Sequence, residues 1–347
     1  MNTSLQQLCE AVQRNCHISD ARQGADYGLC TYLMKMREYF RWEQGLGFDV
    51  SLPREEVGDW LTEREALWNS LADKELVHLP LADERFDPFE VDAINAELEP
   101  LGLVYSAGYG VKNKPLFFLG HLERREQPGT VSVWVSGREL ARDLTAPAAM
   151  NQGERIFIRR ESFRRLLWEK LESWRWHRPD NALGRAFACY DFENALESSL
   201  DAMVEQELNA VLLHEQGEYQ VSCEVGDRWN QLLLDLGYTP AELMARAIRD
   251  HWADCRVTLP ELIRQSDAAS IHFYVGGLSG MRKSLFPKLQ QAYEQWSESG
   301  DWQLLEQVAL QGRNHWSGLA HELLDLHEQH GNAAARPIKE LVEGRYL

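Results

Sequence analysis

The sequence contains no hydrophobic run of the length that crosses a bilayer, which excludes an ordinary helical membrane protein. Its six cysteines are scattered without a CxxC pair, which excludes a disulfide scaffold. The first residues also lack a basic segment followed by an apolar one, so no signal peptide is expected. These absences lead us to expect a cytoplasmic protein without a membrane partner.

Positive charge is scarce, because 36 Lys and Arg residues stand against 54 Asp and Glu residues and give a net charge of −18. Such a field repels phosphate backbones, so we expect no nucleic-acid partner. At 347 residues, with 44% hydrophobic residues, the chain is long enough for two packed sub-domains. The sequence does not indicate an oligomeric state.

Helical periodicity dominates both ends of the chain, and strand-like segments lie between them. The segments LVYSAGYG, PLFFLGHL, VSVWVSG and RIFIRR fall between Leu101 and Arg160. This pattern predicts an α+β fold that is mostly α-helical, a helical bundle with a small antiparallel β-sheet inserted in the first half. We expect N-terminal helices over 1–100, the sheet over 101–160, and a helical region over 161–347 that packs with the N-terminal helices.

The stretch LNAVLLHEQGEYQ, residues 208–220, places polar side chains where the apolar face of a long helix predicted over 191–223 should continue. Helical spacing puts Glu207, His214 and Glu218 on one line, and Glu215 lies beside them. Buried carboxylates are costly unless they are paired or bind a metal. Carboxylate and imidazole ligands suit iron, manganese or zinc, so these residues form a predicted metal site.

A polar region near the N-terminus offers partners for this site. Helices are predicted from Thr3 to Arg14 and, capped by Ser19, on to Gln44. Three polar residues here are expected to face His214 as further metal ligands: His17, Asp20 and Asp26. Two alternatives stay open. In the first, the helix at His214 ends in a solvated turn, and Gly217 favours this because glycine weakens a helix interior. In the second, the polar residues form internal ion pairs.

Two further segments are candidates for binding an anion. One is an island rich in arginine and tryptophan that includes Arg159 and Arg160, and arginine suits phosphate. The other is a glycine-rich stretch before a helix, with Gly277, Gly280 and Lys283. The alternatives are ion pairs with the abundant carboxylates and a tight turn between helices.

Several stretches resemble signatures of an uncharacterised bacterial family with no established activity: CHISDARQGADYGLCTYLMKMREYFRWE, GRELARDLTAPAAM, IFIRRESFRRLLWEKLE and HFYVGGLSGMRKSLFP. This resemblance implies no catalytic residue. The function is therefore unknown, and the first hypothesis is a site for a metal or small ligand between helices, in a metal-dependent hydrolase or oxidoreductase. The alternative is a non-catalytic binding or assembly protein that recognises an anionic ligand or a protein partner.

Overall fold

The structure is a computed structural model that describes residues 3–23, 27–81, 84–127 and 129–347. The chain divides into two compact units, each described by itself. Unit 1 contains Met1–Glu172 and Glu193–Asp201, and unit 2 contains Ser173–Phe192 and Ala202–Leu347. Among the described residues, no helix combines the length and the apolar character that a membrane span requires.

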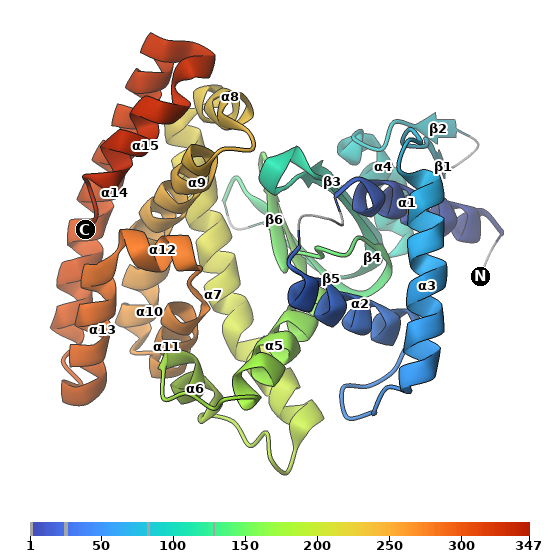
Figure 1. Cartoon of the computed structure of the whole chain (residues 1–347), viewed down its shortest axis with the longest axis horizontal. Coiled ribbons are helices and arrows are strands. Elements are labelled where there is room, and N and C mark those ends of the chain that lie inside the picture. Colours follow the sequence, from blue (N-terminus) through green and yellow to red (C-terminus); the bar gives the residue numbers. More distant parts are fainter. Residues whose placement is uncertain (1–2, 24–26, 82–83, 128) are drawn as a thin grey trace. The chain divides into compact units, whose positions relative to one another are not determined.

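Unit 1 combines helices with two sheets. Its helices are α1 (Thr3–Gln23), α2 (Leu29–Glu43), α3 (Arg54–Leu71), α4 (Val91–Leu98) and most of α5 (Arg160–Arg175), with short 3₁₀ turns η2 (Glu99–Leu101) and η3 (Val111–Asn113). Its strands are β1 (Leu79–Leu81), β2 (Glu84–Phe86), β3 (Leu103–Tyr109), β4 (Pro115–Glu126), β5 (Ser132–Arg142), β6 (Ala149–Gln152) and β7 (Arg155–Arg159). The α+β class and the predominance of helix are confirmed (Figure 1).

The main sheet has the order β3-β4-β5-β7-β6, and β5 pairs with β7 in parallel. The other pairings of this sheet are antiparallel, so the sheet is mostly antiparallel, as predicted, with one parallel pair. The segment after β5 crosses to the sheet edge, where β6 forms, and β7 then inserts between β6 and β5. The sequence did not reveal β6 or the separate β1–β2 pair, because four-residue and three-residue strands carry little periodicity.

The predicted break between Arg14 and Ser19 is also wrong, because α1 continues unbroken to Gln23. Ser19 does not cap a helix. Its hydroxyl donates to the carbonyl of Pro115, at the start of β4. The polar residues of this part of α1 thus bond to the sheet instead of ending the helix.

The sheet of unit 1 has apolar side chains on both faces. On one face Val12 and Cys16 of α1 pack with Phe117 of β4. On the other face Phe118 and Phe157 belong to a second buried cluster. Alternating residues of β4 thus point to opposite faces, as the period of a strand requires.

Unit 2 consists of helices. They are α6 (Ala182–Phe187), most of α7 (Leu196–Val225), α8 (Asp227–Leu236), α9 (Pro240–Ala253), a π-helical turn η4 (Asp254–Thr258), α10 (Leu259–Gln265), α11 (Ala268–Gly277), α12 (Gly280–Leu285), α13 (Pro287–Ser299), α14 (Trp302–His330), a 3₁₀ turn η5 (Gly331–Ala333) and α15 (Ala335–Glu343). The long helix α14 lies beside α9 and α13 (Figure 1). Large buried residues such as Trp252 and Trp316 fill the core.

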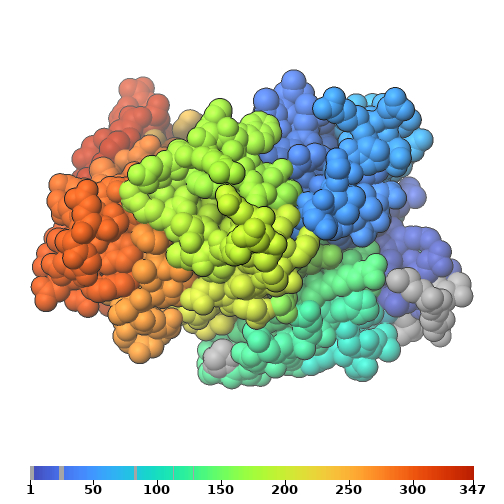
Figure 2. All heavy atoms as spheres, turned by 90° about the horizontal axis from the view of Figure 1, so that it is seen from below, coloured from blue at the N-terminus to red at the C-terminus, as the bar shows by residue number. Residues whose placement is uncertain are grey.

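The segment that leads from α5 to α7 lies at the surface. Its lime-green atoms are in open view in Figure 2, and Trp176 exposes 76% of its area. Asn181 caps α6 by accepting a hydrogen bond from the amide of Gly184. The stretch HRPDNALG therefore interrupts the helical pattern between α5 and α6.

Candidate metal centre

The candidate site lies in unit 2, where α7 meets α9 at a glycine. A Cβ added to Gly217 would lie 2.6 Å from the carbonyl oxygen of Ala253. No other residue type leaves room for this approach. His214 and Glu218 flank Gly217 on α7, and Asp250 precedes Ala253 by three residues. The close approach of the two backbones therefore brings polar side chains of both helices together.

Three side chains form the centre of the cluster. One ligand atom each from His214, Glu218 and Asp250 lies within 4.8 Å of the other two. The Nε2 atom of His214 is 3.6 Å from Oε1 of Glu218, which is too long for a hydrogen bond. The side chains of His214 and Glu218 are 27% and 14% exposed, so the cluster is partly accessible.

Asp254 holds the other nitrogen of His214. Its Oδ1 lies 2.7 Å from Nδ1 of His214 and accepts a second hydrogen bond from Thr258 at 2.8 Å. Its Oδ2 accepts from the hydroxyl of Tyr274 at 3.0 Å and from Arg282. Because Asp254 is fully buried and has these four partners, it fixes the imidazole ring.

The backbone around Asp254 is unusual as well, since Asp254–Thr258 forms a π-helical turn between α9 and α10. Such turns are rare and often occur at functional sites. The turn contains both Asp254 and the hydroxyl of Thr258 that bonds to it. A change of helical pitch thus coincides with the residue that orients His214.

Burial and neighbouring charges shift the pKa values of the titratable groups in the cluster in different directions. Burial alone would lower the pKa of His214, but the charge and hydrogen bond of Asp254 outweigh burial and raise it to about 10. Burial and the neighbouring Glu218 raise the pKa of Asp250 to about 6 and that of Glu215 to about 8. Glu218 has a pKa of about 2, because Arg249 and His214 outweigh the effect of burial.

Arg249 precedes Asp250 on α9 and pairs with one carboxylate of the cluster, that of Glu218. It donates to Oε1 of Glu218 at 2.8 Å. Glu218 therefore has a cationic partner, as the ion-pair alternative expected. Arg282 likewise forms an ion pair with Asp254, the carboxylate that bonds to His214.

Of the predicted metal ligands, the structure brings His214 and Glu218 together and places the buried Glu215 close enough to interact with both. Glu207 is fully buried on the same helix but does not belong to the group. Among the described residues, neither carboxylate oxygen of Glu207 has a hydrogen-bond partner. Burial raises the pKa of Glu207 to about 8, and the nearby Ser270 opposes this shift only in part.

The predicted partners near the N-terminus belong to unit 1. His17 lies against Arg64, and its Nδ1 accepts from the indole of Trp68 at 3.2 Å. Asp20 accepts from the ammonium of Lys114 at 2.7 Å. Asp26 lies outside the described residues. His17 and Asp20 thus have partners within unit 1, and a joint site with His214 stays a prediction.

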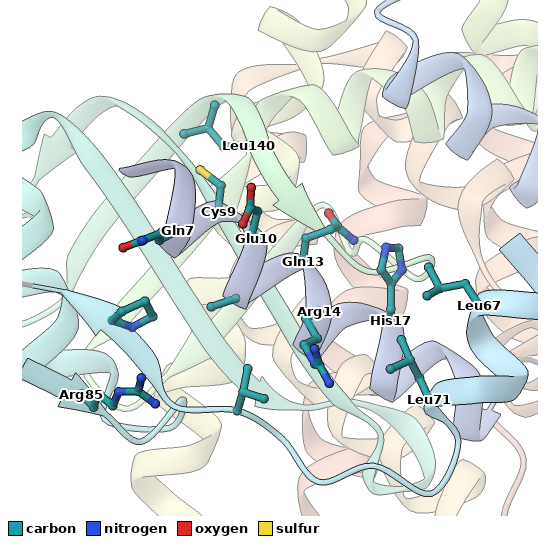
Figure 3. A pocket seen from close by; sticks show the side chains of 13 residues that line it. Gln7, Cys9, Glu10, Gln13, Arg14, His17, Leu67, Leu71, Arg85 and Leu140 are labelled. Carbon is teal, nitrogen blue, oxygen red and sulfur yellow. The ribbon is translucent and has the colours of Figure 1, made fainter. Parts of the chain in front are cut away.

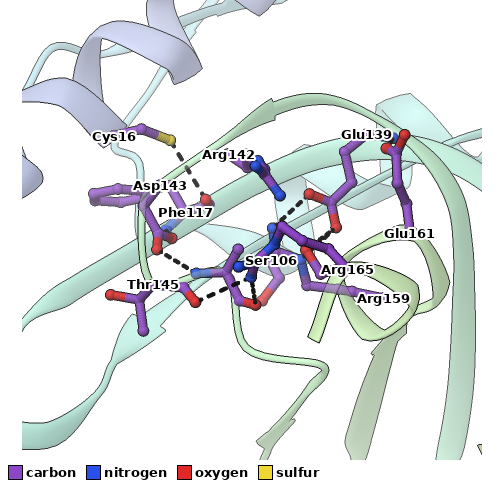
Figure 4. A network of polar contacts seen from close by, with 12 residues as sticks. Cys16, Ser106, Phe117, Glu139, Arg142, Asp143, Thr145, Arg159, Glu161 and Arg165 are labelled. Atoms are coloured by element: carbon purple, nitrogen blue, oxygen red, sulfur yellow. Dashed lines mark hydrogen bonds and ion pairs between the residues drawn. The ribbon is translucent and has the colours of Figure 1, made fainter. Parts of the chain in front are cut away.

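The predicted anion-binding arginines lie in a polar network of unit 1. Arg159 is fully buried and forms two hydrogen bonds with Glu139, at 2.9 and 2.8 Å (Figure 4). Arg160 lies 3.6 Å from Glu123. Ser162 also donates to Glu139. These contacts are the ion pairs that the alternative expected, and anion binding at Arg159 and Arg160 stays a prediction.

The glycine-rich stretch forms a tight turn between α11 and α12, with Gly277 and Gly280 exposed on either side of it. Ser279 caps α12 by accepting from the amide of Arg282. This cap starts the short helix that directs Arg282 to Asp254. Lys283 lies on α12, and anion binding at Gly277, Gly280 and Lys283 stays a prediction.

Sequence reasoning missed the α9 half of the cluster. The segment ARAIRDHWADC places Asp250 and Asp254 four residues apart, next to the apolar residues Ile248 and Trp252. His214 and Glu218 were identified by the same pattern, two polar residues one helical turn apart beside apolar residues. The polar interruption was therefore present in the sequence but was overlooked, and Arg249 and Tyr274 carried no such signal.

Comparisons with known proteins identify the family. Residues 7–159 match the N-terminal domain of a family of unknown function, DUF6866, and residues 164–345 match its C-terminal domain. The chain therefore belongs to this two-domain family, which confirms the expectation of an uncharacterised family. No curated protein and no solved structure gave a significant match.

Proposed function

We propose that unit 2 binds one divalent transition-metal ion through His214, Glu218 and Asp250, and that the protein is a metal-dependent hydrolase. The observation that carries this proposal is the convergence of three ligand atoms from two helices within 4.8 Å. An imidazole and two carboxylates suit zinc, manganese or iron. The sequence also predicts His214 and Glu218 as metal ligands.

The contacts of Asp254 support the proposal. Histidines that bind metals usually direct their second ring nitrogen to a carboxylate, which fixes the tautomer and the ring orientation. Asp254 is in that position at Nδ1 of His214, so Nε2 is directed toward Glu218. Asp254 itself is saturated by its own partners and is not counted as a ligand.

The number of ligands favours catalysis over a structural role for the metal. Structural zinc sites are closed by four protein ligands, whereas catalytic sites keep a position for water or substrate. Here three ligands converge, and the imidazole is partly exposed. An ion with an open position supplies a Lewis acid that activates water. If the bound ion is iron, we propose an oxidoreductase instead of a hydrolase.

A second candidate function has its own observation. Arg249 donates to Glu218 at 2.8 Å, and Arg282 pairs with Asp254. In this alternative the cluster is an ion-pair network without a metal, and it only holds α7 against α9. The two functions differ in what a metal analysis measures.

The test is the metal content of untagged full-length protein purified without added metal or chelator, followed by absorption spectra during titration with Co²⁺. We expect about one equivalent of metal and Co²⁺ bands that saturate near one equivalent. His214→Gln and Asp250→Asn should abolish both while the circular dichroism spectrum is retained.

The matched control is His327→Gln. His327 also contacts a carboxylate in unit 2, Asp235 at 2.8 Å, but it is not part of the three-ligand group. This variant should bind Co²⁺ as the parent does. Metal-free protein whose Co²⁺ spectrum matches that of Co²⁺ in buffer would favour the ion-pair network instead.

A further inference from the structure

We propose that unit 1 binds a small organic anion with an apolar body in a pocket along α1, where Arg14 and Arg85 supply the positive charge. The pocket has a volume of about 800 Å³ and is independent of the metal centre. Volumes of this size are typical of sites for small molecules. Nothing in the family description assigns a ligand to this unit.

One face of α1 forms a wall of the pocket. Gln7, Glu10, Arg14 and His17 recur at spacings of three and four residues, so they lie along one side of the helix (Figure 3). Leu67 and Leu71 of α3 line the pocket near His17. Pro80 and Arg85 are directly opposite each other in the β1–β2 pair and line it as well.

The cations of the pocket are the first argument for an anionic ligand. Although the chain carries 54 acidic residues, neither Arg14 nor Arg85 has a carboxylate partner within the described part of the chain. Glu10 lies one helical turn from Arg14, yet its carboxylate accepts from Gln6. Both guanidinium groups are thus available for a carboxylate or phosphate.

The apolar lining is the second argument. Leu67 is 39% exposed, and Leu71, Val77, Pro80 and Leu140 also line the pocket. An inorganic anion would not cover this surface, whereas an aliphatic or aromatic group would. His17 does not add charge, because burial and the neighbouring Arg64 lower its pKa to about 3. The pocket therefore fits an amphipathic anion whose head group lies at Arg14 or at Arg85.

The experiment uses isothermal titration of the full-length protein with four probes that separate head group from tail. Octanoate and octyl phosphate carry both features, octanol lacks the charge, and acetate lacks the tail. We expect at least one of the two octyl anions to bind, about tenfold or more tightly than octanol and acetate. The ratio of octanoate to octyl phosphate affinity then identifies a carboxylate or a phosphate ligand.

The variant Arg14→Gln/Arg85→Gln should weaken binding of the octyl anion about tenfold, because the charge-assisted contact is lost whichever arginine holds the head group. The control Arg54→Gln/Arg138→Gln removes the same charge from two exposed residues of unit 1 outside the pocket and should bind as the parent does. Cys9 lines the pocket, so the bound anion should slow its alkylation but not that of the exposed Cys30.

Three results would overturn the proposal. The first is that neither octyl anion binds, which would also leave an acidic protein partner as the better explanation of the two arginines. The second is equal affinity for octanol and octanoate. The third is unchanged anion binding by the Arg14→Gln/Arg85→Gln variant.

Discussion

Replacing Glu207 by glutamine should stabilise the protein, and more so as the pH rises. Glu207 is fully buried on α7, and its carboxylate oxygens have no hydrogen-bond partner among the described residues. Burial therefore favours the neutral acid and raises its pKa from 4.5 to about 8. Glutamine has nearly the same shape and cannot ionise.

The size of the effect follows from the two pKa values. Between pH 4.5 and 8 the folded protein keeps a proton on Glu207 that the unfolded chain releases, so stability falls as the pH rises. At pH 7 this loss amounts to about 3 kcal/mol relative to pH 4.5, since one pH unit corresponds to about 1.4 kcal/mol. The glutamine variant lacks this loss.

The assay is urea denaturation of the parent and Glu207→Gln at pH 5 and pH 8, with Glu306→Gln as the control because Glu306 is exposed on α14. The difference between variant and parent should be small at pH 5 and should grow to about 3–4 kcal/mol at pH 8. The control should show no such growth. A difference that is the same at both pH values, or a variant less stable than the parent at pH 8, would refute the argument from burial.

Three further predictions concern packing, acid sensitivity and orientation. Gly217→Ala should destabilise the protein by about 1–3 kcal/mol in urea denaturation, because the new Cβ meets the backbone of Ala253. Gly318→Ala, with no atom within 4 Å of the new Cβ, should be neutral or stabilising. The folded-state pKa of His17, about 3, lies below its ordinary 6.5, so the contribution of His17 to stability should fall by about 2 kcal/mol between pH 7 and pH 5. The unfolding free energy of the parent should therefore drop by that amount relative to His17→Gln over the same interval. Asp254→Asn should weaken Co²⁺ binding about 10- to 100-fold, measured by competition with a chelator, because it removes the carboxylate that orients His214. Unchanged affinity in that variant would remove Asp254 from the site.

Much of the helical half of the fold was predictable because amphipathic helices have strong local signals. The helix predicted from Thr3 does begin at that residue, and the region after Arg160 that was predicted to be helical consists of helices. The strands of the main sheet were also found, except for β6. Their order was not, since the parallel pairing of β5 with β7 depends on a crossover that periodicity does not encode.

Half of the candidate site was predictable for the same reason. His214 and Glu218 interrupt an apolar line on one helix, and that interruption is visible in the sequence. Gly217 was interpreted as evidence for a weak, solvated helix end, but the structure places it against Ala253 at the closest approach of two helices. A glycine selected for contact between helices and one that merely weakens a helix look identical in a single sequence, so the partner helix could not be inferred.

The most direct test of the metal centre is a titration of the chelator-treated full-length protein with Zn²⁺, in competition with a chromogenic chelator. We expect one Zn²⁺ site per chain, with an affinity at least 100-fold weaker in His214→Gln and in Asp250→Asn and unchanged in His327→Gln. Zn²⁺ binding that is equal in all four proteins, or no binding by the parent, would contradict this expectation and leave the cluster as an ion-pair network between α7 and α9.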